Sequence, residues 1–155
     1  MEAEFLQMIR LHQGVIHKVC RLYRDSPEDR EDLFQEIVYQ LWRAFPSFEG
    51  RAKLSSWMYR IALNTALASF RKHSPDISYP VVLPEQLSDP PEGNVQQEQL
   101  LAALKQLTDP EKAIIALYLE DMSYQEIAAI VGIDENYVGV KLNRIKTKIK
   151  NILKI

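Results

Sequence analysis

Residues 123–144 read SYQEIAAIVGIDENYVGVKLNR, and they set the architecture of the C-terminal part of the chain. Ser123, followed three residues later by Glu126, matches the capping box S/T-x-x-E that starts helices. Gly132 is the residue type that most easily takes the left-handed conformation at a helix end. Asp134 can then cap a following helix. The segment therefore predicts a short helix, a glycine turn and a last helix of about five turns, which together form a helix-turn-helix.

The apolar residues of this segment are spaced for two crossing helices. Ile127 and Val131 face the core from the first helix, and Ala128 is small enough to let the second helix approach closely. Val138 and Leu142 continue the inward face of the second helix. A helical hairpin that only packs is one interpretation, but from Tyr137 onward the charged residues of the second helix are all basic, and this favours DNA. Its start would lie in the major groove while Lys and Arg meet phosphates. The basic residues after position 136 are Lys141, Arg144, Lys146, Lys148, Lys150 and Lys154, with no acidic residue among them.

Upstream of the helix-turn-helix, a second capping box formed by Thr108 and Glu111 starts another helix. Residues 95–155 are therefore expected to form one helical domain. Residues 73–94 are expected to be a linker, because five of the eight prolines lie there and helix cannot run through them. This linker has four acidic residues and no Lys or Arg.

Residues 1–72 are expected to form a second domain of three or more helices. The first spans about residues 2–24, with apolar residues near helical spacing. Ser26 can cap the next helix, with Pro27 at its first position, and this helix runs to about residue 45. The third spans about residues 54–72, and its expected inward residues are Leu54, Trp57, Met58, Ile61 and Ala62. Nothing in the sequence favours strands, so the expected fold class is all-α, with two small helical domains joined by a Pro-rich linker.

The composition excludes several classes of protein. Of the 155 residues, 46% are hydrophobic, enough to bury a core, and the single cysteine, Cys20, cannot form an internal disulfide. There is no charged-then-apolar leader, and the longest apolar run, residues 113–119, is too short to span a bilayer, so a cytoplasmic protein without membrane insertion is expected. His12, His17 and His73 lack partners at metal-ligand spacing, and no phosphate-binding glycine loop occurs. We therefore expect no metal, no cofactor and no enzymatic activity.

Three motifs resemble the RNA polymerase sigma factors of the sigma-70 family. Residues 107–153, LTDPEKAIIALYLEDMSYQEIAAIVGIDENYVGVKLNRIKTKIKNIL, resemble region 4, which reads the −35 promoter element. Residues 32–45, DLFQEIVYQLWRAF, resemble the polymerase-binding helix of region 2, and residues 57–72, WMYRIALNTALASFRK, resemble its −10 helix. The motifs stand in the family's order over most of the chain without other sigma regions, and this is similar to the extracytoplasmic-function (ECF) group.

The resemblance implies a role for each motif. The exposed face of the second helix would grip the coiled coil of the polymerase β′ subunit, through Asp32, Leu33, Gln35, Glu36 and Gln40. Region 4 would dock on the β flap. The loop at 46–53 would capture a flipped base of the −10 element, with Asn64 placed to read bases and Trp57 structural. The −10 contacts implied are Phe48, Arg51, Lys53, Arg60, Asn64, Arg71 and Lys72. The −35 contacts implied are Asn136, Tyr137, Gly139, Val140, Lys141 and Arg144.

One position departs from the family. Many relatives carry a basic or polar residue where this chain has Gly139, which lowers helix stability by about 1 kcal/mol relative to alanine. Glycine there either lets the backbone approach DNA closely or removes a contact, so the −35 sequence is not inferred.

The expected function is a transcription initiation factor that binds core RNA polymerase and directs it to promoters, with an anti-sigma factor as a further partner that the resemblance allows. The alternatives are a stand-alone helix-turn-helix regulator and a helical adaptor. The region-2-like motifs argue against the regulator, and the segregated basic faces argue against the adaptor.

Overall fold

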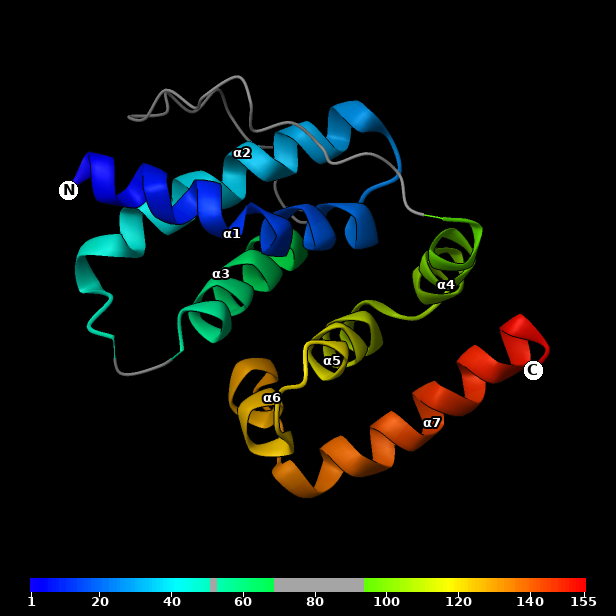
Figure 1. Ribbon diagram of the computed structural model, residues 1–155. Helices are drawn as coiled ribbons and strands as arrows, with labels where there is room; N and C mark the ends of the chain where they lie inside the picture. The colour runs from blue at the N-terminus through cyan, green and yellow to red at the C-terminus, as the bar shows by residue number, and fades with distance from the viewer. Residues whose placement is uncertain (51–52, 69–93) are drawn as a thin grey trace. The chain divides into compact units, whose positions relative to one another are not determined.

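The computed structural model describes residues 1–50, 53–68 and 94–155, and all regular structure in these ranges is helical, without a strand (Figure 1). This confirms the all-α fold class. The chain divides into two compact units, Met1–Pro90 and Pro91–Ile155, called the N-terminal and C-terminal units below. The expected linker, residues 73–94, lies outside the described ranges except for Asn94.

The N-terminal unit is built from α1 (Glu2–Tyr23), α2 (Pro27–Ala44), the short 3-10 helix η1 (Phe45–Ser47) and α3 (Leu54–Ala68). Each of the three α-helices packs against the other two. The predicted start of α2 is confirmed, because the Asp29 backbone N–H donates to Ser26 Oγ at 3.1 Å and Pro27 opens the helix. The backbone of α1 departs from helical values at His12 (φ −120°, ψ 18°), a kink that the sequence did not predict.

The buried face of α3 differs from the expected one. Met58 and Ala62 are buried as predicted, but Leu54, Trp57 and Ile61 are only half-buried. The other residues that α3 buries are Tyr59, Leu63, Thr65 and Ala66. The reason is that α3 packs against both α1 and α2, so its buried face spans adjacent residues instead of a single stripe. The expected continuation of this helix to residue 72 lies outside the described ranges.

A half-buried arginine joins two helices of this unit. Arg24, which ends α1, donates from Nη1 to the Tyr23 carbonyl at 2.8 Å and from Nη2 to the Ala66 carbonyl of α3 at 3.3 Å. Its own carbonyl accepts from Arg30 Nε of α2 at 3.2 Å. A cation suits the last carbonyls of a helix, since these carry the negative end of the helix dipole. The three helices are therefore tied together by polar contacts as well as by the apolar core.

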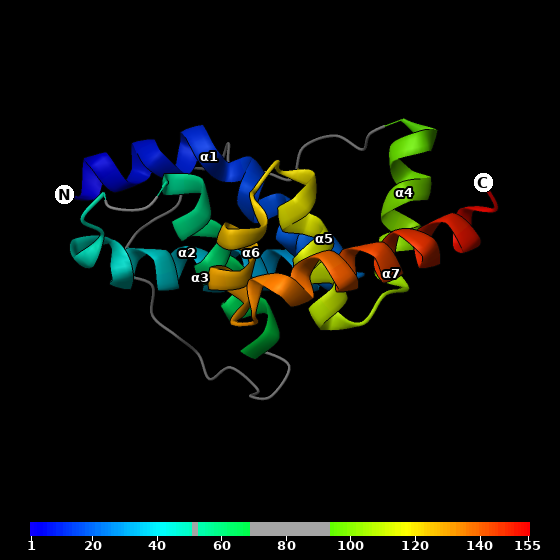
Figure 2. The same cartoon turned by 90° about the horizontal axis from the view of Figure 1, so that it is seen from below.

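The C-terminal unit contains α4 (Val95–Lys105), α5 (Asp109–Leu119), α6 (Tyr124–Val131) and α7 (Glu135–Leu153). Figure 2 shows α7 beginning beside α6 and crossing α4 toward its C-terminal end, and α7 also packs against α5. Both predicted capping boxes are present, with Thr108 and Ser123 as caps. Gly132 ends α6 at φ 81°, and Asp134 Oδ1 accepts from the Asn136 N–H at 3.1 Å to start α7. These local predictions are confirmed.

We expect Gly132→Ala to lower the free energy of unfolding by about 1 kcal/mol. A Cβ at Gly132 would meet nothing within 4 Å, so the cost arises only from the backbone. Alanine in the left-handed conformation costs about 1–2 kcal/mol, and its stiffer unfolded chain returns about 0.4–1 kcal/mol. Urea unfolding followed by circular dichroism measures the change.

The matched control is Gly14→Ala in α1. A Cβ there also meets nothing within 4 Å, but Gly14 has no positive φ, so alanine should raise the free energy of unfolding by about 0.5–1 kcal/mol. Equal effects of the two substitutions would contradict the assignment of the turn.

Candidate nucleic-acid and partner interfaces

The helix-turn-helix is formed by α6 and α7, and its inner side is fully packed. Ile127 of α6 and Val138, Leu142 and Ile145 of α7 are 0% exposed. The tight turn is closed by two hydrogen bonds to the Ala128 carbonyl, from the N–H of residue 132 at 2.8 Å and of residue 133 at 3.2 Å. The orientation of α7 about its own axis is therefore set by apolar packing.

This orientation turns the first half of α7 outward. Tyr137 is 61% exposed and Val140 is 48% exposed, while Asn136 and Arg144 are also exposed and Lys141 and Gly139 are half-buried. Neither Lys141 nor Arg144 has a hydrogen bond or ion pair within the described residues. The two cations expected to contact DNA are thus not neutralised by any of the described residues, which is what a phosphate-binding surface requires.

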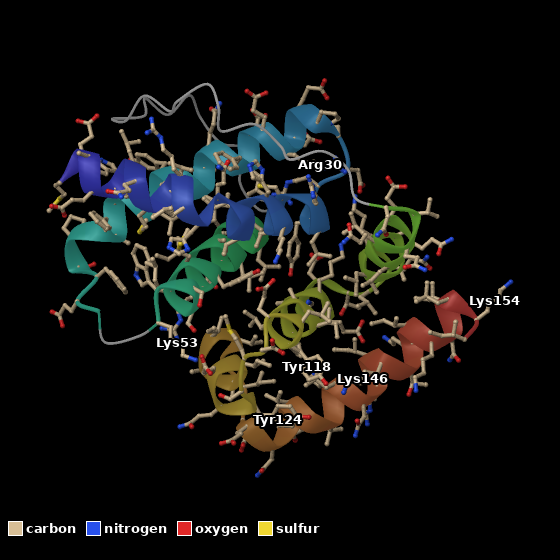
Figure 3. The ribbon with its side chains drawn as sticks, viewed as in Figure 1. Arg30, Lys53, Tyr118, Tyr124, Lys146 and Lys154 are labelled. Carbon is tan, nitrogen blue, oxygen red and sulfur yellow. The ribbon has the colours of Figure 1, made fainter. Side chains whose placement is uncertain are left out.

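Two further cations of α7 are occupied by contacts with α5. Lys146 Nζ donates to Tyr118 Oη at 3.0 Å and lies 4.3 Å from the centroid of that ring (Figure 3). Lys148 Nζ donates to Glu111 Oε2 at 2.7 Å. The hydrogen bond to Tyr118 raises the pKa of Lys146, against the opposing effect of partial desolvation. Partial burial raises the pKa of Glu111, but the hydrogen bonds from Lys148 and Thr108 outweigh it and bring that pKa below its usual value.

The cations of the basic helix therefore differ in their contacts. Lys146 and Lys148 hold α7 to α5, whereas Lys141 and Arg144 have no hydrogen bond or ion pair with the described residues. Sequence reasoning missed Tyr118 and Glu111 as their partners, because the pairs are separated by 28 and 37 residues.

The polar face of α2 is the second candidate surface. Asp32 is exposed, and Gln35, Glu36 and Gln40 are half-buried, with Gln40 Nε2 donating to Glu36 Oε1 at 3.3 Å. Tyr39 lies among these residues and was not singled out from the sequence, although its position between Glu36 and Gln40 places it there. The guanidinium of Arg43 lies 5.9 Å from the centroid of the Tyr39 ring.

Leu33 does not belong to this surface. Its side chain is only 3% exposed and lies in the core with Ile37 and Leu41, one and two turns further along α2. Leu33 was expected to be a polymerase-binding residue, but its buried side chain instead supports α2 beneath the polar face. A direct contact of its side chain with a partner would require the core to open.

The loop between α2 and α3 is the third candidate surface. Phe48 is half-buried, and its ring centroid lies 4.7 Å from that of Trp57. Gly50 has φ 75°, which suits glycine, and Lys53 is exposed. On α3, Arg60 and Asn64 are both exposed, as expected. Arg51, Arg71 and Lys72 lie outside the described residues.

Trp57 is therefore not the purely internal residue that the sequence analysis expected. It is half-buried and its ring contacts that of Phe48 at a tilt of 35°, so the two rings form one aromatic surface at the loop.

Two kinds of site are absent from the described parts of the chain. No three His, Cys, Asp or Glu residues there are grouped so that they could hold a metal ion. Of the helices seen in those parts, none combines the length and the apolar character that crossing a membrane demands.

Two family models match the chain. The model described as Sigma-70 region 2 matches residues 8–75, and the model described as Sigma-70, region 4 matches residues 97–149. The first match contains α2, α3 and their loop, and the second contains the helix-turn-helix.

Relatives that match along most of this chain are ECF sigma factors. The chain is 25% identical to the ECF RNA polymerase sigma factor SigM of Mycobacterium tuberculosis, over 96% of this chain and 76% of that protein. It is 26% identical to the ECF RNA polymerase sigma factor SigW of Bacillus subtilis, over 90% of this chain and 83% of that protein. Among solved structures, it is similar to the sigma factor RpoE of Bartonella quintana, crystallised with the anti-sigma factor NepR. That likeness has a TM-score of 0.75 at 20% identity and covers 98% of each chain.

Proposed function

Because the chain belongs to the sigma-70 family, as a member of its ECF group, we propose that α2 binds core RNA polymerase while α3 and α7 read the two elements of a promoter. The chain is a transcription initiation factor that directs the polymerase to promoters.

The observation that best supports this assignment of roles is which cations on α7 are paired and which are not. Lys141 and Arg144 are unpaired within the described residues and lie beside the exposed Asn136, Tyr137 and Val140. Unpaired cations next to neutral polar and apolar groups suit a surface that meets phosphates and base edges together. We assign the −35 contacts to this face of α7, with Val140 suited to a thymine methyl group.

The face of α2 suits a protein partner instead of DNA. Asp32, Gln35, Glu36 and Gln40 place carboxylates and amides on one side of the helix, and carboxylates repel phosphates. Basic or amide groups on the coiled coil of the polymerase β′ subunit would meet them. Region 4 is proposed to dock on the β flap.

The aromatic surface made by Phe48 and Trp57, together with Lys53, Arg60 and Asn64, is proposed to hold the −10 element once the strands separate. Unpaired bases stack on aromatic rings, and nearby cations follow the backbone. Arg51, Arg71 and Lys72, outside the described residues, are assigned to the same role from the family motif.

The remaining assignments follow from this function. The polymerase carries out the chemistry, so no catalytic step or cofactor is assigned to this chain, and the cytoplasm is the proposed compartment. We propose residues 1–72 and 95–155 as the two binding domains, with 73–94 as the linker. An anti-sigma factor is a further proposed partner.

We predict that the double variant Asp32→Ala, Gln35→Ala weakens binding to core polymerase. Each charge-assisted hydrogen bond lost at an interface costs about 1.5–3 kcal/mol. A pull-down titration measures the affinity, with circular dichroism to check the fold. Glu4→Ala, an exposed acid on α1, is the control and should bind core normally. Unchanged affinity of the double variant would remove α2 from the interface.

We predict that the double variant Lys141→Ala, Arg144→Ala loses protection of the −35 element in footprints of the reconstituted holoenzyme. Each lost phosphate contact should also reduce the salt dependence of binding by about 0.9 in the log–log slope. Lys150→Ala removes an exposed cation further along α7 and is the matched control. Protection at wild-type strength would show that α7 is not the recognition helix.

We predict that Arg51→Ala and Lys53→Ala slow the formation of open complexes more than initial promoter binding, because unpaired bases appear only after melting begins. A template with a pre-melted bubble should still need both residues. Arg10→Ala, an exposed cation on α1, is the control. Full rescue of both variants by the bubble would limit their role to melting and exclude base capture.

A further inference from the structure

Gly139 lies in the middle of α7, where glycine lowers helix stability relative to alanine. A Cβ built at this position would lie 3.3 Å from Cε2 and 4.0 Å from Cδ2 of Tyr124, the first residue of α6. The first distance is shorter than an ordinary contact, so even alanine would have to displace the ring slightly. The edge of the Tyr124 ring therefore rests on the backbone of α7 in the space that a side chain at 139 would occupy.

This space borders the surface of α7 that points away from the core. Asn136 and Asn143 lie one turn before and one turn after Gly139, and all three share a face of the helix. Asn136, Asn143 and the neighbouring Val140 are exposed. Tyr124 itself is 41% exposed, although its ring is in contact with α7. The ring thus adds a partly exposed aromatic group to the face assigned above to DNA.

Local contacts hold Tyr124 in place. The residue before it, Ser123, accepts from the Glu126 N–H at 3.1 Å and has its own N–H bound by Glu126 Oε1 at 3.3 Å, so the backbone at the start of α6 is fixed. Further along the same side of α7, Lys146 is held by Tyr118. Figure 3 shows Tyr124 where α6 meets α7, with Tyr118 and Lys146 close together between α5 and α7.

We propose that Tyr124 is a DNA-contacting residue of the −35 surface, seated on Gly139, and that its hydroxyl takes the place of the side chain missing at position 139. This rests on the proposed function of α7. Gly139 then neither brings the backbone close to DNA nor simply removes a contact. Instead, the glycine makes room for a side chain from the neighbouring helix. The contact is neutral, in contrast to the cationic contacts of Lys141 and Arg144.

The neutral character gives the proposal a distinctive signature. A cation that meets a phosphate releases counterions, so its removal changes the salt dependence of binding, whereas removal of a hydroxyl does not. Tyr124→Phe should weaken DNA binding about ten-fold, as expected for one lost hydrogen bond to a charged group, with an unchanged salt slope.

The test uses holoenzyme reconstituted from the full chain and core polymerase. The probes are duplex fragments that the wild-type holoenzyme selects from a random-sequence library. Binding is measured over a range of salt concentrations for Tyr124→Phe, Tyr124→Ala, Gly139→Ala and the double variant Tyr124→Ala, Gly139→Ala. Gly14→Ala is the control for glycine replacement in a helix and should leave binding unchanged.

Gly139→Ala should weaken DNA binding by displacing the ring, without lowering the melting temperature, because alanine is the better helix former. When the ring is absent, alanine at 139 should not weaken DNA binding further. The double variant should therefore bind DNA like Tyr124→Ala alone. An equal cost of Gly139→Ala with and without the ring would overturn the proposal.

Other outcomes separate this inference from the function on which it rests. Tyr124→Phe binding within two-fold of wild type, while Lys141→Ala still weakens binding, would overturn the inference alone. Weaker binding of Tyr124→Phe to core, while holoenzyme assembled with an excess of core binds DNA like wild type, would assign the ring to the polymerase and also overturn it. If neither Lys141→Ala nor Arg144→Ala affects DNA binding, the proposed function of α7 fails.

Discussion

The burial of Val138, Leu142 and Ile145 controls what α7 can present to a partner. All three are fully buried, and they fix the rotation of α7 about its axis against α5 and α6. Since side chains on a helix keep fixed angular positions, this packing leaves Asn136, Tyr137 and Val140 outward. A substitution that disturbs the apolar packing of the inner side would therefore rotate α7 and change the recognition surface, even if no outer residue were altered.

The cations of α7 differ in the side chains that they contact. Lys146 and Lys148 reach back to Tyr118 and Glu111 of α5 and strengthen the same packing. Lys141 and Arg144 have no such neighbour within the described residues. Glu111 has two tasks, because it completes the capping box of α5 and binds Lys148, which links the start of α5 to the second half of α7. The helix that is proposed to read DNA is thus held in place by two of its own cations.

The N-terminal unit follows the same principle. The inward stripe of α2, which includes Leu33, Ile37 and Leu41, places Asp32 and Gln35 on the outer side, where the polymerase is proposed to bind. In the loop that follows, the ring of Phe48 contacts the ring of Trp57, which belongs to α3. The aromatic surface of the loop is therefore supported by α3 and not by loop residues alone. In both units, a partner-binding surface is positioned by the apolar face behind it.

Local structure was determined by the sequence itself. The caps at Ser26, Thr108, Ser123 and Asp134 and the left-handed Gly132 were all predictable, because each depends on hydrogen bonds or backbone angles within about four residues. The three motifs identified the family for a similar reason, since each is a contiguous segment. Tertiary structure alone decided that Leu33 is core, that Trp57 is half-exposed beside Phe48, and that Tyr124 rests on Gly139. These contacts join helices and loops whose crossing geometry depends on the packing of the whole unit, and no local pattern encodes which side chains then meet.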